Sequence, residues 1–133
     1  MALSNIGGGR QDGDGNTAEV VLLAQGAPVT ATATATLTVA QLTGKLIVAD
    51  PSTSAASYTL PTAATLDAAL VNAHTDSAFE VNIVNLGTSS GAITIVTNTG
   101  WTLVGAVVIA IGTTGNFRAR KLAATNTWVL YRV

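Results

Sequence analysis

The sequence predicts an all-β fold, a jelly-roll-like antiparallel sandwich with one short inserted helix and an extended N-terminal arm. Three observations predict this class. First, short segments in which apolar and polar residues alternate fill the chain from residue 45 onward. Second, these segments are separated by Gly, Asn and Thr. Third, only one stretch is Ala-rich with helical spacing. Short strands separated by turn signals about every 8–12 residues are typical of a sandwich or a barrel.

Composition narrows the class of protein. The chain has 133 residues, no Cys, a net charge of -1 and only 10% charged residues, against about 25% in a typical domain. We expect one domain without disulfides, and no dedicated nucleic-acid binder, since such a protein carries a basic excess. The longest apolar run, residues 103–111, is shorter than the roughly 18 residues of a membrane helix, and residues 1–7 lack the pattern of a signal peptide. The low charge suggests that other subunits cover part of the surface.

The N-terminal region divides into three parts. Residues 1–16 are rich in Gly, Asp, Asn and Ser and predict a flexible arm, and residues 18–23 predict a short apolar strand. In residues 30–39, Thr alternates with Ala, Leu and Val, so a strand would place all Thr side chains on one face. This stretch is either an extended linker or a long strand whose Ala face packs on a neighbouring subunit. We therefore divide the chain into an arm with extended strands, residues 1–40, and a β-sandwich domain, residues 41–133.

Within the sandwich domain the helix is expected at residues 63–73, after a capping Thr62, with Leu66 and Leu70 on one face. Trp128 and Phe117 occupy apolar positions of alternating strands and are predicted core residues. The predicted strands, in chain order, are residues 45–50, 58–60, 79–83, 93–95, 101–103, 107–111, 117–120 and 128–133.

No group of residues points to catalysis, a cofactor or a metal. His74 is followed by Asp76 and Ser77, but residues this close in sequence do not fold onto each other as a triad, and they predict a solvated connection. Residues 12–16 imitate the start of a calcium loop, yet the sixth and twelfth positions hold Thr and Leu instead of Gly and Glu. Asp67 is expected on an exposed helix face. We predict that the protein is not an enzyme.

Arg118 and Arg120 are two residues apart on one predicted strand, so their side chains share a face. They form either a solvated strand face or an anchor for carboxylates of a protein partner, since Arg suits bidentate pairing.

The chain from residue 58 to 133 resembles the head decoration (cement) proteins of tailed bacteriophages. The resemblance depends on residues 58–63, the helix with Leu66 and Leu70, and residues 76–85, 100–105, 117–121 and 128–133. It implies a homotrimer on the outer capsid surface that clamps neighbouring major capsid proteins. We also expect assembly in the host cytoplasm, which the absence of Cys fits, and no nucleic-acid or membrane partner. The alternative is a receptor- or glycan-binding β domain of a tail fibre or adhesin, which exposed aromatic residues would favour.

Two sets of contact residues follow from this hypothesis. An arm can reach across a junction between capsid subunits, so we expect the capsid contact at Asn5, Ile6, Arg10, Val20, Val21 and Leu22. We expect the trimer contact at Ala31, Ala33, Ala35, Leu37, Arg118 and Arg120.

Overall fold

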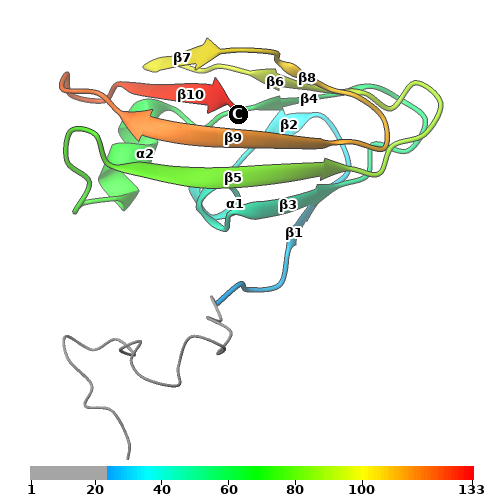
Figure 1. Ribbon diagram of the computed structural model, residues 1–133, viewed down its shortest axis with the longest axis horizontal. Coiled ribbons are helices and arrows are strands. Elements are labelled where there is room, and N and C mark those ends of the chain that lie inside the picture. Colours follow the sequence, from blue (N-terminus) through cyan, green and yellow to red (C-terminus); the bar gives the residue numbers. More distant parts are fainter. Residues whose placement is uncertain (1–23) are drawn as a thin grey trace, which may run out of the picture.

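The computed structural model describes residues 24–133, which form two β-sheets and two short helices (Figure 1). The six-stranded sheet has the spatial order β1 (Val29–Ala31), β3 (Leu46–Ala49), β5 (Ala78–Asn85), β9 (Thr114–Lys121), β10 (Trp128–Arg132) and β7 (Trp101–Val104). The four-stranded sheet has the order β2 (Ala35–Thr36), β4 (Ala56–Thr59), β6 (Ile93–Val96) and β8 (Val108–Ile109). Apolar side chains from both sheets share one core, so the predicted β-rich class is confirmed and the arrangement is compatible with a sandwich.

The chain alternates between the two sheets from β1 to β9, so it winds around the core instead of folding back in hairpins. This winding makes β1, β3 and β5 parallel neighbours in one sheet and β2, β4 and β6 parallel neighbours in the other. Five of the eight strand pairings are parallel, including that of β7 with β10. The expectation of an antiparallel sandwich was therefore wrong for most strand pairs, because consecutive strands from β1 to β9 lie in different sheets and do not pair with each other.

The Thr/Ala stretch is not one long strand. A bend at Ala33 and Thr34 divides it into β1 and β2, which belong to different sheets, so both strands are part of the sandwich and not of a separate arm. Next comes helix α1 (Val39–Thr43), which was not predicted. It begins with a capping box, in which Thr38 accepts from the Gln41 backbone N–H and the Gln41 side chain accepts from the Thr38 N–H.

Helix α2 (Ala63–Ala69) confirms the predicted helix but is shorter than expected. Thr62 caps it by accepting from the Thr65 N–H, as predicted. The helix ends at Leu70, which leaves the helical conformation. Leu66 is buried and Leu70 is half-buried, so their shared face is turned toward the core as the spacing predicted.

The core contains the predicted aromatic residues. Trp128 and Phe117 are buried, and Trp101 lies against Trp128 with ring centroids 6.0 Å apart. The predicted strand at residues 107–111 is only the two-residue β8, and most of its apolar side chains are exposed instead of buried. Among the described residues, no helix is long and apolar enough to cross a membrane.

Candidate functional site

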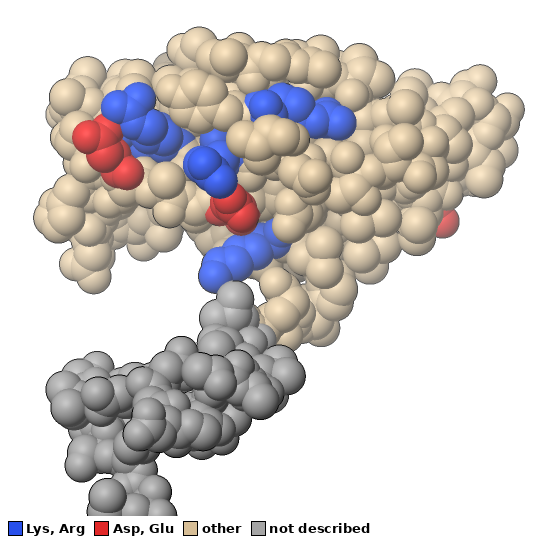
Figure 2. All heavy atoms as spheres, viewed as in Figure 1, with Lys and Arg blue, Asp and Glu red and all other residues tan. Residues whose placement is uncertain are grey.

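The outer face of the six-stranded sheet carries most of the charged side chains seen in Figure 2. Register places Arg118 of β9 opposite Glu80 of β5, and their side chains form an ion pair at 2.6 Å. Arg120 pairs in the same way with Asp76, which lies just before β5. Both pairs are exposed to solvent, where an ion pair adds little to stability. The prediction that the two arginines share a face is confirmed, but each already has a carboxylate partner in its own chain.

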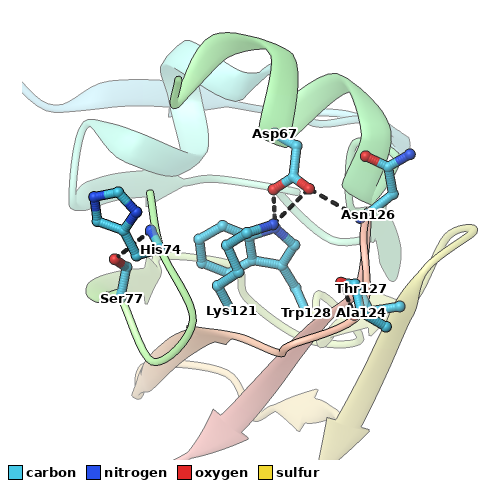
Figure 3. A network of polar contacts seen from close by, with 8 residues as sticks. All are labelled: Asp67, His74, Ser77, Lys121, Ala124, Asn126, Thr127 and Trp128. Atoms are coloured by element: carbon cyan, nitrogen blue, oxygen red, sulfur yellow. Dashed lines mark hydrogen bonds and ion pairs between the residues drawn. The ribbon is translucent and has the colours of Figure 1, made fainter. Parts of the chain in front are cut away.

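A second polar cluster joins α2 to the end of the sheet, and it contains the most enclosed ion pair in the described part of the chain (Figure 3). Asp67 of α2 accepts from the Lys121 Nζ at 2.6 Å, from the Trp128 Nε1 at 2.8 Å and from the Asn126 backbone N–H at 2.9 Å. Its side chain is 16% exposed, so the expectation of an exposed helix face was wrong. Asp67 lies four residues after buried Ala63 and three before Leu70, and this spacing already placed it on the inner face.

The environment of Asp67 favours its ionised form. Burial raises the pKa of this carboxyl, but the hydrogen bonds from Lys121, Trp128 and Asn126, together with the charge of Lys121, outweigh burial and lower the pKa below its usual value. An acid that must donate or accept a proton near neutral pH needs a raised pKa. The three contacts of the ionised carboxylate fix α2 against β9, β10 and the loop between them.

Among residues 24–133, His74 and Asp76 have other partners than each other. The Ser77 Oγ accepts from the backbone N–H of His74, which forms a turn and leaves the imidazole out of the contact (Figure 3). Asp76 is engaged with Arg120. Within residues 24–133 no group of three or more His, Cys, Asp or Glu residues could hold a metal ion.

A shallow hollow of about 350 Å³ lies between the end of α2 and the start of β5. Its walls are mainly apolar and include Leu70, Phe79 and Trp128, with Thr43, Asn72 and Ser77 as polar residues. A small-molecule site combines an enclosed apolar cavity with a few converging polar groups. This hollow is open to solvent and no charged side chain lines it, so it does not define a ligand.

Exposed aliphatic side chains occur on and next to β7 and β8, which are edge strands of the two sheets. We call this group the β7–β8 edge surface, and its members are Val96, Val104, Val107, Val108 and Ile111, each between 39% and 48% exposed. A groove runs through it between β6 and β7, lined by Val96, Leu103 and Val107 among others. Exposed apolar surface of this kind, at an open sheet edge, marks a site of protein contact.

One cation lies at the rim of the β7–β8 edge surface. The Arg132 guanidinium donates to the carbonyl oxygen of Ala106, in the connection between β7 and β8, and to that of Val108, the first residue of β8. Arg118, Arg120 and Lys121 have carboxylate partners, but no ion pair joins Arg132 to a carboxylate of residues 24–133.

The structure separates the predicted contact residues into three groups. All six predicted capsid-contact residues lie outside the described part of the chain. Leu37 is 2% exposed within the protein's own core, so its assignment to a trimer contact was wrong. Ala33, Ala35, Arg118 and Arg120 are accessible and Ala31 is half-buried, and their contact with another subunit stays a prediction.

Sequence analysis missed the β7–β8 edge surface. The sequence predicts residues 107–111 as a buried strand, whereas most of these side chains are exposed. Comparison of the chain with protein-family models, with curated proteins and with solved structures found no match.

Proposed function

We propose that this protein is a structural component of a bacteriophage virion. In this proposal it binds the outer surface of the capsid as a homotrimer and stabilises the shell by clamping neighbouring major capsid proteins. It acts by mass action and not by catalysis, since a ligand that binds only the assembled shell stabilises that shell. Trimerisation would add avidity to three weak contacts. The protein would assemble in the host cytoplasm and remain on the outside of the virion.

The single observation that supports this proposal most is the β7–β8 edge surface. Five exposed aliphatic side chains at the open side of a sandwich form an unfavourable surface for an isolated subunit. A protein that works within an assembly covers such a surface with its partners. The low charge of the whole chain and the sequence resemblance support the same class of function. The jelly-roll-like arrangement that this class implies stays a prediction.

The alternative, a receptor- or glycan-binding domain, requires exposed aromatic side chains on which a sugar or a peptide can stack. Of the six aromatic residues in the described part, Trp101, Trp128, Tyr58 and Phe117 are buried and Phe79 and Tyr131 are half-buried, so none is fully exposed. The side chains of Tyr58 and Trp101 are also fixed by hydrogen bonds to the backbone oxygens of Ala31 and Pro61. This arrangement favours the structural proposal over the glycan-binding alternative.

Co-sedimentation with purified capsids tests the proposal directly. We expect the full chain to sediment with mature shells, to saturate at a fixed ratio, and to raise the temperature at which the shells release their DNA. Binding to a glycan array, with no binding to shells, would instead favour the alternative. The test variant is Val104→Lys, which should lower occupancy if the β7–β8 edge surface takes part in assembly on the shell.

A further inference from the structure

Of the four strands at the edges of the two sheets, β7 is the one without protection. β2 and β8 have only two residues each, and Pro28 immediately precedes β1. Short edges and adjacent Pro residues prevent pairing with other chains. β7 has four residues, Trp-Thr-Leu-Val, without charge or Pro, and within residues 24–133 only β10 pairs with it. Its second edge therefore offers backbone N–H and C=O groups to an added strand.

The chain contains a segment that matches this edge. Residues 18–23, Ala-Glu-Val-Val-Leu-Leu, combine β-branched and aliphatic residues with a single charge and precede the first described residue. Such a sequence has high strand propensity, and an extended peptide that adds to a sheet edge also places alternate side chains in the adjoining groove. The groove beside β7 combines aliphatic residues such as Leu103 with Thr97 and Thr102, and the one charge of the segment, Glu19, is complementary to Arg132 at its rim.

The segment cannot reach β7 of its own chain. β1 and β7 are the opposite edges of the six-stranded sheet, and five strand spacings separate them, or about 24 Å at about 4.8 Å each. A strand added outside β7 lies one spacing further, at about 29 Å. From residue 23 to Val29 there are six residues, which span about 20 Å when fully extended. Residues 18–23 can therefore pair with β7 only in another copy.

We propose that residues 18–23 of one copy add as a strand to β7 of a second copy. Donor and acceptor lie at opposite edges of the sheet, which Figure 1 shows for β1 and β7, so the contact is head-to-tail. Head-to-tail contacts close into a ring when the rotation permits, and three copies would give the trimer of the proposed function, on which this inference depends for its copy number. It assigns Val20, Val21 and Leu22 to a neighbouring copy and leaves Asn5, Ile6 and Arg10 as predicted capsid contacts.

Disulfide trapping tests the contact, because the chain has no native Cys. Cys is introduced singly at positions 20, 21 and 22, and each variant is mixed with a separate Thr102→Cys variant under mild oxidation. We expect at least one mixture to give a covalent heterodimer on a non-reducing gel. Val71→Cys, on a 79% exposed side chain away from β7, is the matched control and should not cross-link. Equal cross-linking to Val71→Cys, or no cross-link at all, would overturn the proposal.

A complementation experiment tests the direction of the contact. Val21→Pro should disable the donor because Pro cannot complete a strand ladder, and Val104→Lys should disable the acceptor. Each variant alone should be monomeric by light scattering, whereas their mixture should form a one-to-one dimer, since each retains the part that the other lacks. Gly8→Pro and Val71→Lys are the controls and should remain oligomeric. If both disabled variants keep the wild-type oligomer, the proposal is wrong.

The outcomes separate this inference from the proposed function. A chain that forms trimers without residues 18–23, and still binds capsids, would overturn the strand exchange but leave the structural role intact. A chain that exchanges strands but does not bind capsids would overturn the proposed function alone.

Discussion

Asp67 is the residue whose environment differs most from what its residue type suggests. A carboxylate in an Ala-rich helix is ordinarily solvated, but here three donors from the last part of the chain converge on it. The indole of Trp128 satisfies its N–H through this contact while its ring fills the core. One side chain thus couples α2 to β9 and β10, and the cost of removing it should be larger than for any exposed carboxylate of the domain.

We expect Asp67→Asn to lower the free energy of unfolding at pH 7 by about 3 kcal/mol, because it leaves Lys121 without its counter-charge in a largely enclosed site. The pKa of Asp67 is lower in the folded protein than in the unfolded chain, so its contribution is complete above the unfolded value of about 3.9 and is lost as the pH falls toward the folded value. Denaturant unfolding at pH 7 and pH 3 should therefore show a smaller difference between variant and wild type in acid.

Glu80→Gln is the matched control for this prediction. Glu80 also forms an ion pair, with Arg118, but its side chain is 57% exposed, so its removal should cost less than about 1 kcal/mol. A difference between Asp67→Asn and wild type that did not change with pH would show that the carboxylate does not act through its charge.

At the scale of elements, the connections decide how the strands are arranged. Gly100, immediately before β7, has a φ of 85°, and a Cβ there would meet the Asn126 backbone oxygen and the Ala63 side chain. The chain therefore brings the start of β7, the start of α2 and the loop before β10 to one crowded point. Only a residue without a Cβ allows this approach together with a positive φ.

Gly100→Ala should destabilise the protein more than Gly112→Ala does, and the comparison isolates the effect of crowding. Both glycines have positive φ, at 85° and 68°, so both substitutions incur the conformational cost of about 1–2 kcal/mol. Only at Gly100 does the added methyl group also clash, since a Cβ at Gly112 meets open space. Thermal unfolding of the two variants measures the difference. Equal melting temperatures would mean that the neighbours of Gly100 move away without cost.

At the scale of the whole molecule, the outer face of the six-stranded sheet and the β7–β8 edge surface differ in charge and polarity. The outer face of the six-stranded sheet carries paired charges and is well solvated, whereas the β7–β8 edge surface is apolar. An oligomer built through the β7–β8 edge surface would leave the charged face free. Self-association would then occur at a sheet edge. Substitution of Arg118 and Arg120, which lie on the charged face, tests independently whether these two residues contact another subunit as predicted.

The double substitution Arg118→Ala and Arg120→Ala separates these two possibilities. Both ion pairs are exposed, so the unfolding midpoint of the monomer should change little. If the two arginines contact another subunit, as the sequence analysis predicts, sedimentation velocity should show a weaker trimer. An unchanged trimer would exclude them from the contact and leave the β7–β8 edge surface as the interface.

The sequence by itself determined most of the strands, the cap at Thr62, helix α2 and the buried positions of Trp128 and Phe117, because these follow from local periodicity and capping chemistry. It also contained the signal for α1, since Thr38 and Gln41 have the spacing of a capping box. Only the tertiary structure decided that β1, β3 and β5 lie parallel and that residues 107–111 are largely exposed. Period-two alternation identifies a strand and its two faces, but the choice of neighbour depends on which segments, distant in sequence, complete the same core.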